Sequence, residues 1–247
     1  MKQNPRIAVA QIRYFDRGNS NLAKIKKYIS LAKKAGADII CFPETCVHKT
    51  KLLSLKHAFI KEICDECRKN SIWAIITEHI TLKEKNYNMA ILINREGKIK
   101  GHYKKINLYG DYVNPGKNIK VFDTDFGKVG IIICWDIRFP ELFKKMKQKG
   151  AEIIFCPSKW EYDKWAHDKA HKKREVKVLE SLVKTRAYEN LVYVALCNPL
   201  TKSKHQVSYS AIASPHRLLK EIIGKEGMIV SSVNLKEIKK FKRLYGS

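Results

Sequence analysis

Two short segments of the chain have nearly the same sequence. Residues 36–44 read Gly-Ala-Asp-Ile-Ile-Cys-Phe-Pro-Glu, and residues 150–158 read Gly-Ala-Glu-Ile-Ile-Phe-Cys-Pro-Ser. Each segment follows a predicted helix that itself follows a predicted strand, which indicates two similar strand-helix-strand halves. Alternatively, this pattern is simply a common helix stop before a buried strand. Two related halves predict an α/β (α+β) fold: a four-layer αββα sandwich of two mixed β-sheets with helices on the outer faces.

The other apolar patterns predict further helices and strands. Apolar spacing predicts helices over 21–35 and 52–70, whereas short β-branched runs predict strands such as 7–12 and 129–133. Residues 104–119 show no clear periodicity and predict a loop.

The length and composition suggest one soluble domain over residues 1–247. The chain is 45% hydrophobic, which is ordinary for a globular protein, and no low-complexity linker divides it. It contains no uninterrupted apolar stretch of about 18 residues, so we expect no membrane association. The seven cysteines are scattered, and several lie in apolar runs. This pattern favours reduced thiols and a cytoplasmic location.

The chain is strongly basic, with 49 Lys and Arg against 24 Asp and Glu and a net charge of +25. Such a charge attracts nucleic acids or anionic substrates. Residues 159–174 also interleave aromatic and basic side chains, as single-strand binding surfaces do. However, lysines occur along most predicted helices, as on solvated helix faces. We therefore expect no nucleic-acid partner and interpret residues 158–170 as a loop that lines a pocket, with Trp160 in its wall.

A candidate nucleophile lies where a predicted strand turns into a helix. The strand over residues 129–133 stops at Cys134, and Pro140 is placed to begin the next helix. A strand-to-helix elbow exposes one side chain, and the N–H groups of the turn converge near it. The alternative is a buried core cysteine, because free cysteines are often buried.

Two other residues complete a plausible set for acyl transfer. Glu44 follows a predicted buried strand, and Lys105 lies in the predicted loop. Because a free thiol is only slightly ionised at pH 7, Cys134 needs a base, which Glu44 could provide. Lys105 and the backbone N–H of Trp135 could then stabilise the oxyanion of a tetrahedral intermediate.

Several separated segments resemble the nitrilase (carbon-nitrogen hydrolase) superfamily, in the same order along nearly the whole chain. The segments are Phe42-Pro43-Glu44, Gly101 to Leu108, Gly130 to Glu141, Arg186 to Asn190 and Val192 to Ala195. Each is weak alone, but their combination is specific. The resemblance implies an αββα sandwich, a Glu44–Lys105–Cys134 triad, no metal or organic cofactor, and a homo-oligomer, dimeric or larger. It also implies hydrolysis of a non-peptide carbon–nitrogen bond in a small-molecule amide.

The chain departs from the family pattern at two positions. Asn107 stands where many members have His, and Asp111 lies where some have a second active-site Glu, so Asp111 is a candidate for substrate positioning. Asp136 resembles the amidase and carbamoyl-amide branches, which makes nitrile hydrolysis the less favoured chemistry. Arg138 is a further pocket candidate.

Two alternatives to the amidase interpretation remain. The first is a basic nucleic-acid-associated protein on an inactive hydrolase scaffold, although such a scaffold has no physical need of all three triad residues. The second is nitrile hydrolysis on the same triad. A metal site is a separate possibility at Cys64 and Cys67, which have suitable spacing. They lie in a predicted helix without a second ligand pair, so we expect no metal site.

Overall fold

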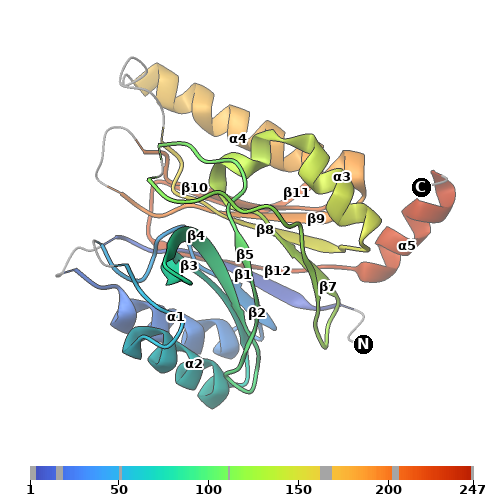
Figure 1. Cartoon of the computed structure of the whole chain (residues 1–247). Coiled ribbons are helices and arrows are strands. Elements are labelled where there is room, and N and C mark those ends of the chain that lie inside the picture. Colours follow the sequence, from blue (N-terminus) through green and yellow to red (C-terminus); the bar gives the residue numbers. More distant parts are fainter. Residues whose placement is uncertain are drawn as a thin grey trace.

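The computed structural model describes residues 4–14, 19–49, 52–110, 112–161, 169–201 and 206–245. Within these residues the chain forms two six-stranded β-sheets, and helices cover the outer face of each sheet (Figure 1). The first sheet contains, in spatial order, β12 (Gly227–Ser232), β1 (Arg6–Gln11), β2 (Ile39–Cys41), β3 (Trp73–Leu82), β4 (Lys85–Ile93) and β5 (Ile99–Lys104). The second contains β11 (Leu218–Ile223), β10 (Tyr209–Ala213), β9 (Tyr193–Cys197), β8 (Ile153–Pro157), β7 (Lys128–Ile131) and β6 (Val121–Asp123).

Helices sheathe the two sheets on opposite sides of the molecule. They are α1 (Leu22–Lys34), α2 (Ala58–Asn70), α3 (Pro140–Gln148), α4 (Lys169–Asn190), α5 (Leu235–Leu244) and the short 3₁₀ helix η1 (Cys134–Arg138). Helices α1 and α2 cover the first sheet, α3 and α4 cover the second, and α5 projects from one end (Figure 1). The predicted four-layer αββα sandwich is therefore confirmed.

The two sheets have the same topology. In the first, β1, β2 and β3 run parallel, β4 and β5 continue antiparallel, and β12 pairs antiparallel with the other side of β1. In the second, β7, β8 and β9 run parallel, β10 and β11 continue antiparallel, and β6 flanks β7. Strands β2 and β8, which carry the sequence repeat, thus occupy equivalent positions. The repeat reflects a structural duplication.

Side chains along the central strands alternate between two separate apolar clusters, so the core has two parts. On β1, Ile7 and Val9 belong to the apolar cluster that includes the second sheet, whereas Ala8 and Ala10 belong to the cluster containing Ile25 of α1. Because successive side chains point to opposite faces of a sheet, a strand covered on both sides needs apolar residues throughout. This explains the continuous apolar runs in the sequence.

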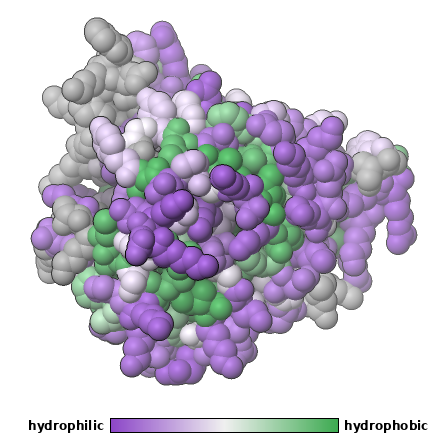
Figure 2. All heavy atoms as spheres, in the orientation of Figure 1, coloured by the Kyte–Doolittle hydropathy of each residue, from purple (hydrophilic) through white to green (hydrophobic). Residues whose placement is uncertain are grey.

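The outer surface carries much of the charge. Hydrophilic residues cover most of the face shown in Figure 2, including the outer helices, while apolar residues gather toward the middle of that view. Lys144 and Lys145 of α3, for example, are exposed. No helix in the described part of the chain is long and apolar enough to cross a membrane.

One sequence prediction about secondary structure was wrong, and one strand was not predicted. The helix predicted over 52–70 begins only at Ala58, after an N-cap at His57. Before the helix, Leu53 donates its N–H to the carbonyl of His79 (3.0 Å), and its own carbonyl accepts from the N–H of Thr81 (2.8 Å). Leu53 therefore lies in an extended segment beside β3, and its apolar side chain is buried there without belonging to a helix. Strand β6 was also missed, because an edge strand this short leaves no periodic signal.

Gly97 closes the turn between β4 and β5. Its N–H donates to the carbonyl of Asn94 (3.0 Å), and its φ of +70° lies in the left-handed region. A Cβ atom at this position would lie 2.4 Å from the carbonyl oxygen of Cys64 in α2. The turn therefore requires glycine for its backbone conformation and for its close approach to the helix.

We predict that Gly97→Ala destabilises the fold more than Gly224→Ala does. Gly224 also has a left-handed φ of +64°, but a Cβ there would meet nothing within 4 Å. Backbone strain should lower the free energy of unfolding of both variants by about 1 kcal/mol. Overpacking should lower that of Gly97→Ala by about 1–3 kcal/mol more. Urea unfolding midpoints measure the difference, and equal midpoints would contradict the proposed contact with α2.

Candidate active site

The two copies of the sequence repeat meet at their carboxyl ends. Glu44 follows β2, and Ser158 follows the equivalent strand β8. The N–H of Glu44 donates to the carbonyl of Ser158 (3.1 Å), and the N–H of Lys159 donates to Oε2 of Glu44 (3.0 Å). Equivalent strand ends from the two sheets thus converge at one point, and Glu44 lies there.

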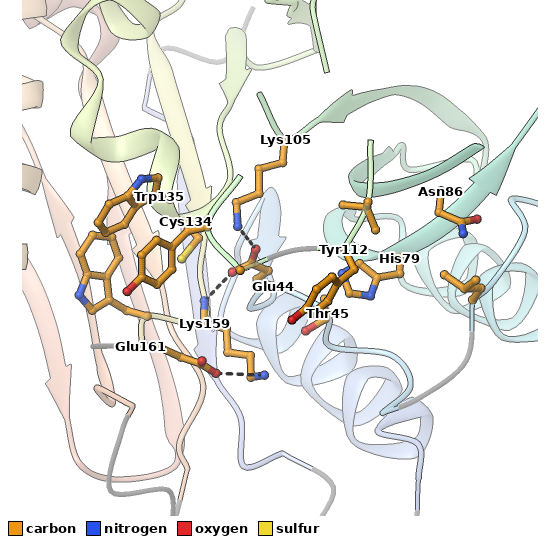
Figure 3. Close-up of a pocket in the computed structure, with 15 residues that line it drawn as sticks. Glu44, Thr45, His79, Asn86, Lys105, Tyr112, Cys134, Trp135, Lys159 and Glu161 are labelled. Atoms are coloured by element: carbon orange, nitrogen blue, oxygen red, sulfur yellow. Dashed lines mark hydrogen bonds and ion pairs between the residues drawn. The ribbon is translucent and has the colours of Figure 1, made fainter. Parts of the chain in front are cut away.

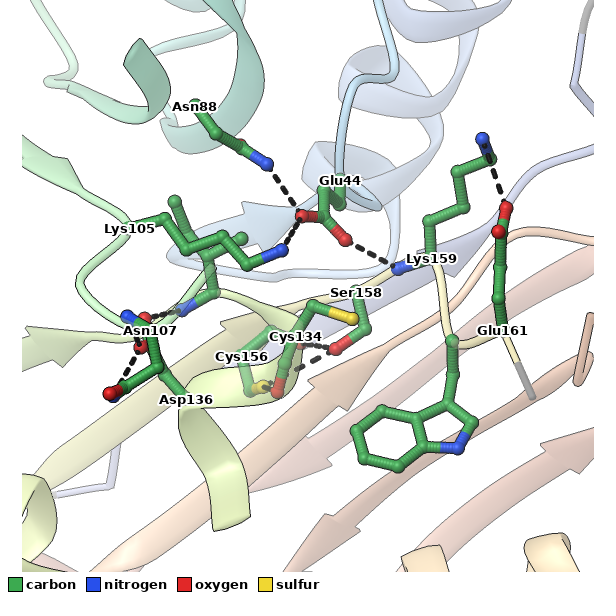
Figure 4. A network of polar contacts seen from close by, with 12 residues as sticks. Glu44, Asn88, Lys105, Asn107, Cys134, Asp136, Cys156, Ser158, Lys159 and Glu161 are labelled. Carbon is green, nitrogen blue, oxygen red and sulfur yellow. Dashed lines mark hydrogen bonds and ion pairs between the residues drawn. The ribbon is translucent and has the colours of Figure 1, made fainter. Parts of the chain in front are cut away.

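The carboxylate of Glu44 is buried in a network of donors. Its Oε1 accepts from Nζ of Lys105 (2.8 Å) and from Nδ2 of Asn88 (2.7 Å), as Figure 4 shows. Glu44 and Lys105 are 4% and 3% exposed, so their ion pair is shielded from water. Buried charges are tolerated when they are paired and hydrogen-bonded in this way.

The backbone around Lys105 is fixed on both sides. Lys105 follows β5, and its N–H donates to the carbonyl of Asn88 (2.9 Å). Its own carbonyl accepts from the N–H of Gly116 (2.7 Å). Asn88 therefore helps to position both members of the ion pair, with its backbone for Lys105 and with its side chain for Glu44.

Cys134 lies on the elbow that the sequence predicts. It is the first residue of η1, its φ of +48° is left-handed, and it is 7% exposed. A non-glycine residue in this conformation is strained by about 1–3 kcal/mol, as often occurs at functional sites. The N–H of Trp135 lies in the first turn of η1, where N–H groups have no acceptor within the helix.

Asp136 holds the elbow in place. One carboxylate oxygen accepts from the N–H (2.8 Å) and the side-chain amide (3.0 Å) of Asn107. The other accepts from the hydroxyl of Tyr103 (2.8 Å) and the N–H of Ile133 (3.1 Å). Asn107 thus connects the elbow at Cys134 to the loop that carries Lys105, a role the sequence did not reveal.

Burial raises the pKa of Cys134 well above its ordinary value, and the carboxylate of Glu44 raises it further. The ammonium group of Lys105 and the backbone N–H of Lys159 lower it, but they do not outweigh burial. The thiol is therefore protonated near neutral pH, and nucleophilic attack requires a base beside it.

Cys134, Glu44 and Lys105 all line a cavity of about 460 Å³ and point toward one another in it (Figure 3). Its other lining residues are Thr45, Leu52, His79, Asn86, Tyr109, Gly110, Tyr112, Val113, Trp135, Lys159, Trp160 and Glu161. The ring of Trp135 lies between two aromatic neighbours, 4.4 Å from Tyr109 and 5.5 Å from Trp160 between centroids. One wall of the cavity is therefore aromatic, and the side chains of Cys134, Glu44 and Lys105 lie together in the same cavity.

The loop after Glu44 is held by a second buried carboxylate. Glu78 of β3 accepts from the N–H groups of Val47 (2.9 Å) and His48 (2.8 Å). Burial raises the pKa of Glu78 to about 7 against these donors. Thr45 of this loop lines the cavity, so Glu78 shapes the site without entering it.

Of the other predicted site residues, some line the cavity and one does not. Trp135 and Trp160 line the cavity, whereas Arg138 is exposed and does not; its guanidinium lies 4.3 Å from the centroid of the Trp135 ring. Asp111 lies outside the described residues. Asn88 was not predicted, although an Asn at the start of the apolar run 89–93 is unusual in a strand and could have signalled a buried polar role.

The structure also bears on the alternatives considered from the sequence. Trp160 is 4% exposed, and its indole N–H donates to Glu175 (2.9 Å), so its ring is not presented for base stacking. Cys64 and Cys67 lie within α2. In the described ranges, no group of three or more His, Cys, Asp or Glu side chains is arranged to hold a metal ion.

We predict that Glu44→Gln shifts the pH dependence of Cys134 alkylation downward by about one pH unit or more. The negative charge of Glu44 raises the thiol pKa, and the substitution removes that charge while leaving the cation of Lys105. Mass spectrometry of the peptide containing Cys134 after iodoacetamide treatment measures the profile. Glu62→Gln, which removes one charge from a half-exposed pair with Lys26, is the control and should leave the profile unchanged. Equal shifts in both variants would contradict the local effect.

Comparison with known proteins identifies the family. The carbon-nitrogen hydrolase family model matches residues 6–243. A citrullinase from Francisella tularensis is 32% identical over 63% of this chain, and omega-amidase NIT3 from Saccharomyces cerevisiae is 26% identical over 75%. The alignments cover 61% and 66% of these two proteins, less than two thirds of each.

Solved structures of the superfamily share the fold. Nit3 from S. cerevisiae, described as a member of branch 10 of the nitrilase superfamily, superposes with a TM-score of 0.81 at 22% identity, covering 98% of this chain and 94% of that one. A variant of an amidase from Nesterenkonia sp. AN1, carrying the acetamide moiety of fluoroacetamide on its active-site cysteine, superposes at 0.78 and 19% identity, covering 98% and 94%. The chain therefore belongs to the carbon-nitrogen hydrolase family.

Proposed function

We propose that this chain hydrolyses a small amide or carbamoyl amide to the acid and ammonia or an amine, through a thioester on Cys134. The observation that carries the proposal is the buried Glu44–Lys105 ion pair, 2.8 Å between Nζ and Oε1, in the same cavity as the strained Cys134. A carboxylate, an ammonium group and a thiol in one cavity match the needs of acyl transfer.

In the first half-reaction, Glu44 accepts the thiol proton as the sulfur of Cys134 attacks the carbonyl carbon. Because the pKa of the thiol is raised, a free thiolate is unfavourable. In this step the proton moves to Glu44 as the carbon–sulfur bond forms, so no free thiolate is needed. Lys105 and the N–H of Trp135 stabilise the negative oxygen of the tetrahedral intermediate. Glu44 then returns its proton to the leaving nitrogen, and the carbon–nitrogen bond breaks.

In the second half-reaction, water hydrolyses the thioester. Glu44 removes a proton from the water as its oxygen attacks the acyl carbon, and the same groups stabilise the oxyanion. The carbon–sulfur bond then breaks, the acid leaves, and the proton on Glu44 returns to sulfur. Glu44 therefore acts as base and acid in both halves.

The volume of the cavity supports a small-molecule substrate. A volume of about 460 Å³ lies in the ordinary range for small-ligand sites and leaves no room for a folded partner. The names of the citrullinase and the omega-amidase denote action on citrulline and on amides. Because citrulline contains a carbamoyl group, both names support an amide or carbamoyl amide as the substrate of this chain.

We predict that Cys134→Ala abolishes hydrolysis and that intact-mass spectrometry of the wild type detects an acyl adduct on Cys134. Ammonia release across a panel of ω-amides, carbamoyl amines, aliphatic amides and nitriles measures activity and identifies the substrate class. Cys64→Ala, which changes a half-buried cysteine on α2, is the matched control and should retain activity. An active Cys134→Ala protein would refute the thioester route.

We also predict that Glu44→Gln lowers kcat/KM by about 10²- to 10⁴-fold, the usual range for general acid–base catalysis. Glutamine keeps the shape of the side chain but cannot carry the proton. Because the substitution also leaves the buried Lys105 without its carboxylate, urea unfolding must show that the variant is folded under assay conditions. A folded variant with activity within about twofold of wild type would remove Glu44 from the mechanism.

A further inference from the structure

A second cavity of about 230 Å³ shares no lining residue with the first. Lys104 lines it, whereas its neighbour Lys105 lines the candidate active site. Successive side chains at the end of a strand point to opposite faces, so the two cavities lie on the two sides of the same segment. The wall of the second cavity also includes Lys117 and Lys120, and none of the described residues that line it is acidic.

Within the described residues, the lysines around this cavity are not paired with carboxylates. In the part of the chain that the structure describes, neither Lys104 nor Lys117 nor Lys120 forms an ion pair with a carboxylate. Nζ of Lys104 instead lies 3.5 Å from the centroid of the Tyr87 ring. Such a concentration of cations at a concave surface attracts anions.

His102 adds a polar group to the same wall. Burial lowers the pKa of His102, and the nearby Lys120 and Lys104 lower it further. Its imidazole is therefore neutral near pH 7 and retains one N–H donor. The cavity thus offers ammonium donors from two separate segments, β5 and residues 117–120, together with an imidazole.

One chain segment links the second cavity to the candidate active site. Gly116 lines it, and the N–H of Gly116 donates to the carbonyl of Lys105 (2.7 Å). A Cβ atom on Gly116 would lie 2.2 Å from the carbonyl oxygen of Lys104, so the segment is pressed against the end of β5. The same segment contributes Tyr112 and Val113 to the candidate active site.

We propose that this second cavity binds the phosphoryl group of a small molecule and thereby fixes residues 112–118 against β5. A phosphoryl dianion presents oxygens in several directions and can accept from ammonium groups on both segments, whereas a carboxylate presents two oxygens in one plane. Binding neutralises repulsion among the lysines and joins the segment to the strand. This site is separate from the proposed hydrolase chemistry and does not depend on it.

Isothermal titration with inorganic phosphate tests the site. The titration uses a pH at which phosphate is a dianion, and potassium chloride keeps the ionic strength constant. We expect saturable binding to the wild type and at least tenfold weaker binding to the exposed double variant Lys117→Gln/Lys120→Gln. The control Lys144→Gln/Lys145→Gln removes the same charge from exposed positions of α3 and should bind as the wild type does. Equal weakening in both double variants, or no saturable binding to the wild type, would overturn the proposal.

Hydrogen–deuterium exchange tests the effect on the segment. Phosphate should slow amide exchange in residues 112–118 of the wild type and not in the Lys117→Gln/Lys120→Gln variant. Methyl phosphate, compared at the same concentration, distinguishes a phosphomonoester ligand from free phosphate by its relative affinity. Binding without slower exchange would refute the fixing of the segment. Both measurements are made without turnover, so they stand or fall separately from the hydrolase proposal.

Discussion

The buried carboxylate of Glu44 is the group on which the arrangement of the site depends. Its hydrogen-bond donors come from both sheets: Lys105 and Asn88 from the first, and the N–H of Lys159 from the second. A buried carboxylate without such partners would cost several kcal/mol, on the order of the penalty for any unpaired buried ion. The packing of the two sheets therefore makes the charge tolerable, and the charge in turn holds the sheet ends together.

Strained backbone accompanies this carboxylate on both sides of the cavity. Thr45, directly after Glu44, and Cys134 both have positive φ values, 49° and 48°. Hydrogen bonds from neighbouring segments support each strained turn. Glu78 accepts from the N–H of Val47 after Thr45, and Asp136 after Cys134 accepts from Tyr103 and Asn107. The site is thus built from turns that local sequence alone would not stabilise, which is typical of positions kept for chemistry rather than for stability.

Duplication of the fold explains why the site lies where it does. Strands β2 and β8 are equivalent in the two sheets, and their ends meet through the hydrogen bond from Glu44 to Ser158. The two ends differ in chemistry, since one presents a carboxylate and the other a hydroxyl residue followed by a backbone donor. An arrangement with nearly symmetric strands therefore carries an asymmetric site. The asymmetry comes from single residues placed at equivalent strand ends.

The sequence by itself determined the sandwich, because apolar runs and the repeat of residues 36–44 encode strands that must be covered on both faces. It also indicated Glu44, Lys105 and Cys134 as a set, and the elbow at Cys134. Only the tertiary structure decided that Asn88 and the backbone of Lys159 hold Glu44, since these contacts join residues 44 and 115 positions apart. It likewise decided the placement of Arg138 outside the cavity and the link between Asn107 and Asp136. Periodic patterns report which face of an element is buried, whereas hydrogen bonds between distant segments leave no period in the sequence.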